Sequence, residues 1–181
     1  MWNSHAPFSN GGSGAAAAIG TAPFITLLSG TSFGVDFNPT VDRVRVVSNT
    51  GQNLRLDPNT GLVAAVDGAL NPGAPAVAAA AYTNNFAGAT TTTLYVIDPA
   101  TDKLYMQNPP NNGTLVEVGA LGINVEADNG FDIGGQSNIA YGLLTVGTAT
   151  KIYSINLNTG MATAMADVPG LTRGFAVGLG F

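Results

Sequence analysis

The chain repeats a short phrase three times: an apolar strand ending in Asp or Asn, then a turn closed by Thr-Gly or Thr-Asp. The copies occupy 54–61, 95–102 and 153–160. Alternating side chains suit a pleated strand, Pro sets a turn φ, and Gly or Asp tolerates a positive φ. Repeated β units spaced by about 40 to 60 residues indicate a radial or stacked all-β architecture.

The composition fits one folded domain and argues against several kinds of partner. Only 9% of the 181 residues are charged, whereas a disordered chain has high charge and few apolar residues. The net charge is −5 with six Lys and Arg, so we expect binding neither to nucleic acid nor to an anionic membrane surface. Cysteine is absent, which excludes disulfides and thiolate metal sites.

No segment predicts membrane insertion, a leader or a familiar catalytic site. Residues 1–8 lack the basic start and apolar region of a signal peptide. The longest apolar run, 76–82, is too short to span a bilayer and predicts a strand. The single histidine, His5, offers poor support for a Ser-His-Asp triad or a histidine zinc site, and no catalytic residue is identified.

Two further patterns order the strands within each repeat. Segments 61–67 and 160–166 follow their turns and predict outermost strands, and 13–20 has the same shape. Segments 34–37, 130–133 and 174–177 share the order Gly, apolar, small or acidic, apolar, which predicts innermost strands. Capped helical periodicity is absent, so we expect no helix.

These patterns predict an all-β, β-propeller-like fold of repeated four-stranded antiparallel units. Three complete units and one split between the termini form a single domain over 13–181, after a mobile segment at 1–12. The expected units are 31–71, 76–122, 128–170, and 13–30 together with 171–181.

The most distinctive stretch is Phe-Gly-Val-Asp-Phe-Asn-Pro-Thr-Val-Asp-Arg-Val-Arg-Val-Val at 33–47, continued by Gly-Gln-Asn-Leu-Arg at 51–55. Supporting motifs are Asp-Gly-Ala-Leu-Asn at 67–71, Ala-Tyr-Thr-Asn-Asn at 81–85, Gln-Asn-Pro-Pro-Asn at 107–111, Gly-Phe-Asp-Ile at 130–133 and Ile-Asn-Leu-Asn-Thr-Gly at 155–160. Over roughly 13–177, the chain closely resembles an exported bacterial family known only as domain of unknown function 4394.

The resemblance implies a propeller-like fold and an extracellular or cell-surface location, and it brings neither an activity nor catalytic residues. Family members carry further Leu-Tyr-x-Ile-Asp repeats before the point where this chain begins, so it resembles a shortened member. A shortened propeller must close with fewer blades or borrow strands from another copy.

Two aspartates occupy the same place in different repeats. Asp36 and Asp132 are equivalent, and Ala176 stands at that place in a third copy. Paired carboxylates near a propeller axis can hold a cation or act as an acid and base. The alternative is that each carboxylate accepts hydrogen bonds from neighbouring backbone amides, as recurrence within a repeat predicts.

Three of the six basic residues, Arg43, Arg45 and Arg55, lie close together in the sequence. They suit bidentate binding of a carboxylate or a sulfated glycan. Alternatively, they pair with Asp36, Asp42 or a carbonyl where two units meet. The candidate binding residues are Asp36, Asn38, Arg43, Arg45, Asn84 and Asp132.

The turn at Asp57, Asn59 and Gly61 resembles half of a calcium loop, and Asp98 with Asp102 echoes it. Calcium needs six to eight oxygen ligands, and the terminal Glu of an EF-type loop is absent. Asp and Asn in turns usually bond their own backbone. We therefore expect no cofactor or metal site, with calcium a weak alternative.

The leading functional prediction is a non-catalytic exported module that binds or self-assembles through terminal strand pairing. Segment 174–181 is apolar, and an unpaired strand edge is a template for another chain. Pairing with 15–24 of the same chain gives a closed monomer, and pairing with a neighbour gives a ring or filament. The expected assembly residues are Ala15, Ile19, Phe24, Phe175, Val177, Leu179 and Phe181.

The alternative is a protein that binds or hydrolyses carbohydrate or another polymer at the propeller mouth. Hydrolysis would need two carboxylates about 5 to 9 Å apart in an open cleft.

Overall fold

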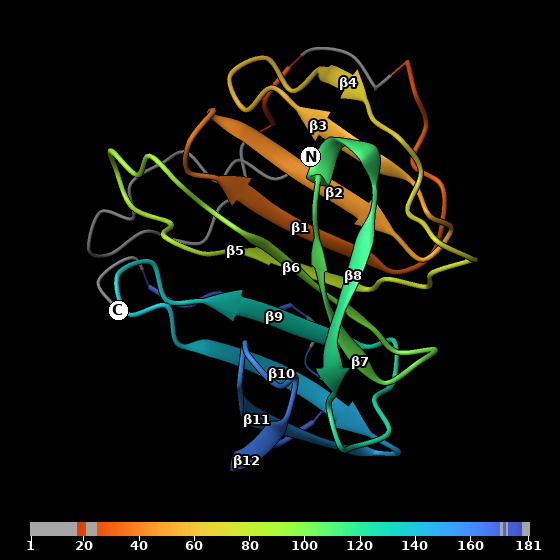
Figure 1. The fold of residues 1–181 in the computed structure, drawn as a ribbon, viewed down its shortest axis with the longest axis vertical. Coiled ribbons are helices and arrows are strands. Elements are labelled where there is room, and N and C mark those ends of the chain that lie inside the picture. Colours follow the sequence, from red (N-terminus) through yellow and green to blue (C-terminus); the bar gives the residue numbers. More distant parts are fainter. Residues whose placement is uncertain (1–17, 21–24, 171, 173, 179–181) are drawn as a thin grey trace.

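The structure, a computed structural model, describes residues 18–20, 25–170, 172 and 174–178. In these ranges the chain forms three four-stranded antiparallel sheets, drawn in Figure 1. The only helix among the described residues is one 3₁₀ turn, η1 (Pro110–Asn112), and no helix there has the length and hydropathy to cross a membrane. The predicted all-β, propeller-like class is confirmed, and the sheets do not close into a ring.

Each sheet is a simple meander in chain order. The first sheet contains β1 (Phe33–Asn38), β2 (Arg43–Ser48), β3 (Asn53–Leu56) and β4 (Val63–Val66). The second contains β5 (Ala79–Tyr82), β6 (Leu94–Asp98), β7 (Lys103–Gln107) and β8 (Leu115–Ala120). The third contains β9 (Asn129–Ile133), β10 (Ala140–Val146), β11 (Ala149–Ile155) and β12 (Ala162–Val168).

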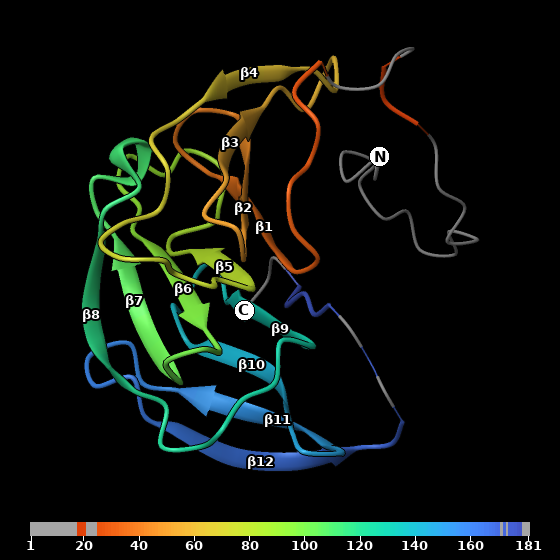
Figure 2. The same ribbon diagram turned by 90° about the vertical axis from the view of Figure 1, so that its right-hand side faces the viewer.

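The three sheets fan out from a common centre. Figure 2 shows β1, β5 and β9 nearest one another and β4, β8 and β12 at the periphery. A side chain at Gly34 on β1 would place its Cβ 2.5 Å from the carbonyl carbon of Ala79 on β5. Glycine therefore allows these innermost strands to pack backbone against backbone.

Two apolar clusters hold neighbouring sheets together. Val47 of the first sheet packs with Tyr82 and Val96 of the second. Ile97 of the second sheet packs with Phe131 and Leu144 of the third. Tyr82 and Tyr153 are buried, and Tyr95 and Tyr105 pack against the clusters, because aromatic rings fill space well on a half-buried pleat.

Strand order agrees with most of the sequence patterns. Segment 61–67 contains the outermost strand β4, and 160–166 overlaps the outermost strand β12. Segments 34–37 and 130–133 lie in the innermost strands β1 and β9. The repeated turn is less regular. The copies at 57–61 and 156–160 join the third and fourth strands, whereas that at 98–102 joins β6 to β7.

The described parts of the two ends lie at different places beside the fan, one near an innermost strand and one near an outer turn. A Cβ at Gly130 would lie 2.7 Å from the Cβ of Phe175, so 174–178 runs next to β9. A Cβ at Gly20 would lie 2.6 Å from the carbonyl oxygen of Thr60, in the turn between β3 and β4. Neither 18–20 nor 174–178 forms a strand. The rest of the predicted split unit (13–17, 21–24, 171, 173 and 179–181) and segment 1–12 lie outside the described residues.

Candidate functional site

Asp36 and Asp132 use their carboxylates to join innermost segments. Asp36 Oδ2 accepts the backbone N–H of Tyr82 at 2.6 Å, and its Oδ1 accepts that of Phe37 at 2.7 Å. Asp132 repeats the arrangement, accepting the N–H groups of Val177 at 2.6 Å and Ile133 at 2.8 Å. This is the amide-accepting alternative for the aspartates, and it leaves their carboxylates engaged with backbone.

Burial perturbs both carboxyl groups. Burial, together with the negative charge of Asp132, raises the pKa of Asp36 from 3.8 to about 7, although the amides of Tyr82 and Phe37 oppose the shift. Burial also raises the pKa of Asp132, against the amides of Val177 and Ile133. A buried carboxyl group favours its neutral form because the anion loses hydration.

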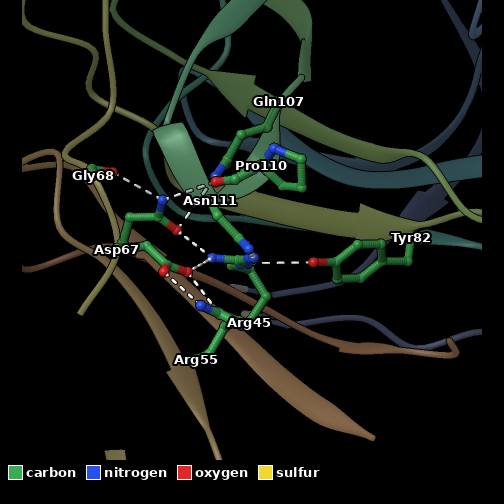
Figure 3. Close-up of polar contacts among 9 residues, drawn as sticks. Arg45, Arg55, Asp67, Gly68, Tyr82, Gln107, Pro110 and Asn111 are labelled. Atoms are coloured by element: carbon green, nitrogen blue, oxygen red, sulfur yellow. Dashed lines mark hydrogen bonds and ion pairs between the residues drawn. The ribbon is translucent and has the colours of Figure 1, made fainter. Parts of the chain in front are cut away.

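Arg45 is the centre of a buried polar network between the first and second sheets, shown in Figure 3. Only 1% of the residue is exposed. Its Nη1 donates to Asp67 Oδ2 at 2.7 Å and to Asn53 Oδ1 at 2.8 Å. Its Nη2 donates to Asn111 Oδ1 at 2.7 Å and its Nε to the Tyr82 hydroxyl at 3.3 Å.

The same network includes a second arginine. Arg55 donates from Nε and Nη2 to the two carboxylate oxygens of Asp67, each at 2.8 Å (Figure 3). Burial opposes ionisation of Asp67, yet the hydrogen bonds from Arg55 and Arg45 lower its pKa overall. Asp67, rather than Asp36 or Asp42, is thus the acidic partner of these two arginines. Because its donors are already paired, Arg45 acts here as a link between sheets.

The other predicted binding residues lie in turns. Asn38 Oδ1 accepts the backbone N–H of Thr40 at 2.9 Å. Arg43 donates to the carbonyl of Asp42 at 2.7 Å and lies 3.6 Å from the carboxylate of Asp57. These contacts keep Asn38 and Arg43 near the link from β1 to β2, and none is made to Arg45.

Asn84 links the second sheet to the third. Its backbone N–H donates to Asn138 Oδ1 at 2.8 Å, and Asn138 Nδ2 donates to Asn84 Oδ1 at 2.7 Å. Both residues have positive φ values, 53° and 54°, which asparagine tolerates better than most residues. The next residue, Asn85, reaches Asp36 Oδ1 at 3.4 Å. The structure thus brings Asn84 near Asp36 through Asn85, in loops that hold sheets together.

Asp57 and Asp98 bond the backbone of their own turns, whereas Asp102 Oδ1 accepts the backbone N–H of Val125 at 2.7 Å. Asp57 Oδ1 accepts the N–H groups of Asn59 and Thr60 at 2.9 and 3.1 Å, and Asp98 Oδ1 accepts that of Ala100 at 2.9 Å. No group of three or more metal-ligating His, Cys, Asp or Glu occurs within the described ranges.

One face of the first sheet lines a large cavity instead of packing on another described sheet. We call this the uncovered face, formed by Phe33, Val35, Phe37, Val44, Val46 and Leu56. Within it Val35 is 57% exposed, whereas Val46 is only 6% exposed. The cavity measures about 920 Å³. On the opposite face, Gly34, Arg45 and Val47 contact the second sheet.

Some predicted assembly residues border this cavity. Ile19 and Phe175 line it, and Val177 is the residue whose amide binds Asp132. Leu27 and Leu28 also line it and are 75% and 47% exposed. Ala15, Phe24, Leu179 and Phe181 lie outside the described residues.

Several residues of these sites were not singled out from the sequence: Asn53, Asp67, Asn111 and Asn129. Asn129 borders the cavity, is 9% exposed, and its Oδ1 has no hydrogen-bond partner among the described residues. For Asp67 a signal was present, because it belongs to the Asp-Gly-Ala-Leu-Asn motif that carries the family resemblance.

Comparison with known proteins gives a family and no activity. The family model described as Domain of unknown function (DUF4394) matches residues 9–176, and a search of curated proteins finds no match. That match includes all three sheets and the residues that join them. The chain therefore belongs to the DUF4394 family, as its sequence motifs predict.

Proposed function

We propose that this domain is a non-catalytic, exported association module that binds another polypeptide through the uncovered face of its first sheet. The low charged fraction of 9% and the resemblance to an exported family support a location outside the cell. In this proposal, copies of the chain also associate with one another through the same face.

The observation that carries this proposal is a difference between equivalent sheet faces. The face of the second sheet that carries Val96 packs on the first sheet, and the face of the third sheet that carries Phe131 packs on the second. The corresponding face of the first sheet borders a cavity of about 920 Å³ and leaves Val35 57% exposed. A contiguous apolar surface of this kind is typical of a protein-binding site.

The polar candidates favour association over catalysis. The carboxylates of Asp36 and Asp132 accept backbone N–H groups, and Arg45 is enclosed by four partners. A general base or a glycan-binding arginine needs polar atoms free to meet the substrate.

Light scattering over a range of protein concentrations tests the proposal. We expect the wild-type mass to rise with concentration and Val35→Lys to remain monomeric, because a lysine on the uncovered face opposes apolar packing. Val116→Lys is the matched control, since Val116 is 42% exposed on β8 and lies outside the cavity lining. A wild-type monomer at every concentration, or equal association of Val35→Lys, would contradict it.

A further inference from the structure

The innermost segments of the repeats alternate in one residue. Asp36 and Asp132 are equivalent by sequence pattern, and the equivalent residues on the segments after them are Ala81 and Ala176. The close approaches support this alignment. A Cβ at Gly34 would meet Ala79 and Ala80, as one at Gly130 would meet Gly174 and Phe175. The order along the chain is therefore Asp, Ala, Asp, Ala.

The hydrogen bonds follow this alternation. An innermost strand that carries Asp satisfies its own next amide, as Asp36 does for Phe37 and Asp132 for Ile133. An innermost segment that carries Ala takes its acceptor from the preceding strand, as Tyr82 does from Asp36 and Val177 from Asp132. An Asp-type sheet thus needs no carboxylate from the sheet before it.

This alternation indicates which kind of sheet fits beside β1 on the uncovered face. The third sheet is the other Asp-type sheet, and the second sheet, an Ala-type one, precedes it. The third sheet is covered by the hairpin of β6 and β7, whose Ile97 and Leu104 pack with Phe131 and Leu144. By equivalence, the uncovered face suits a hairpin of the same kind.

The cavity is bordered by one segment at an innermost position and another at an outermost position. Segment 174–178, next to β9, marks the innermost position. Gly20 marks the outermost, because it approaches the Thr60 turn as Gly119 of β8 approaches Thr159 in the third sheet. In every complete sheet two strands lie between these positions.

We propose that the cavity beside the first sheet accepts a two-stranded β-hairpin from a partner polypeptide, with alternating apolar residues and little charge. This proposal rests on the proposed function and names its ligand class. The hairpin lies between 174–178 and 18–20 and packs one face on Val35, Val44 and Leu56.

A synthetic peptide of residues 94–107, the β6–β7 hairpin, serves as the probe. Titration followed by calorimetry and thermal melting should give saturable 1:1 binding and a Tm that rises with peptide concentration. Binding should weaken at least tenfold for the Val35→Lys protein and remain unchanged for Val116→Lys. The control peptide carries Ile97→Lys and Leu104→Lys, a cross-strand pair on the packing face, and should not bind.

The outcomes separate this inference from the proposed function. Loss of self-association in Val35→Lys without peptide binding to wild type would overturn the hairpin assignment and leave the association module intact. Equal binding of the control peptide, or of the Val35→Lys protein, would also overturn it. Saturable binding of the 94–107 peptide by a protein that stays monomeric would support the hairpin assignment and contradict the proposal that copies of the chain associate.

Discussion

Asp132 on β9 accepts the backbone N–H of Val177 at 2.6 Å, and Asp36 on β1 accepts that of Tyr82 at the same distance. A short segment near the carboxyl end of the chain therefore holds the same place beside the third sheet that β5 holds beside the first. Each aspartate thus connects the innermost strand of one repeat to the innermost segment of the next.

The first prediction concerns pH. Asp36 has a pKa of 3.8 as an ordinary aspartate and about 7 in the fold, so the folded state binds its proton more tightly than the unfolded state. Its contribution to stability is full below pH 3.8 and is lost as the pH rises through about 7. Asp132, whose pKa is also raised by burial, acts in the same direction.

Urea unfolding between pH 4 and 8 measures this effect. We expect the free energy of unfolding of the wild type to fall as the pH rises, by at most about 1.4 kcal/mol per pH unit for one proton. Asp36→Asn, which does not titrate, should show a flatter profile. Asp57 and Asp67 have lowered pKa values, so their contributions to stability are lost only as the pH falls below the pKa of an ordinary aspartate. Parallel profiles for the two proteins would contradict the assignment.

The second prediction compares two arginines. Arg45→Ala leaves Asp67 without one of its two guanidinium donors and Asn53 and Asn111 without an Arg45 partner, and removing one member of a buried ion pair costs about 3–5 kcal/mol. Arg43→Ala removes an ion pair at 3.6 Å whose side chains are 35% and 26% exposed, which costs about 0–1 kcal/mol. Denaturant midpoints measured side by side check the difference; similar losses would disprove the role given to Arg45.

The third prediction concerns the 174–178 segment. Gly130→Ala places a Cβ 2.7 Å from both the Cβ and the backbone nitrogen of Phe175, so that segment must move away from β9. Overpacking of this kind costs about 1–3 kcal/mol. We expect faster hydrogen exchange at the Val177 amide while the β10 and β11 amides keep their protection. Unchanged exchange at Val177 would show that the contact is not maintained in solution.

The fourth prediction concerns calcium. Because Asp57 and Asp98 each direct Oδ1 to backbone amides, we expect the melting temperature to be the same in calcium and in chelator. An upward shift that saturates with calcium would instead indicate a bound ion.

The sequence predicts the repeated units but not which two strands each turn joins. Gly34 and Gly130 mark innermost strands correctly, because only glycine permits their backbone approach. The phrase at 95–102 recurs between β6 and β7, since Asp-Pro and Thr specify a turn type and carry no information on which strands it joins.

The sequence pattern does not predict contacts between residues that are far apart in the chain. Arg45 reaches Asp67 and Asn111, 22 and 66 positions away, and strand alternation cannot choose among distant acceptors. Alternation predicts that Val44 and Val46 of one strand share a sheet face. It does not predict that this face remains uncovered, because that depends on how the sheets are arranged.

Thiol labelling of Val35→Cys tests the central claim most directly, because the chain contains no other cysteine. With Val35 57% exposed, the introduced thiol should react fast in dilute protein and slow markedly as copies associate. A Val116→Cys control should react at the same rate throughout. Concentration-independent labelling at position 35, or a thiol there that is already protected at high dilution, would contradict association through the uncovered face.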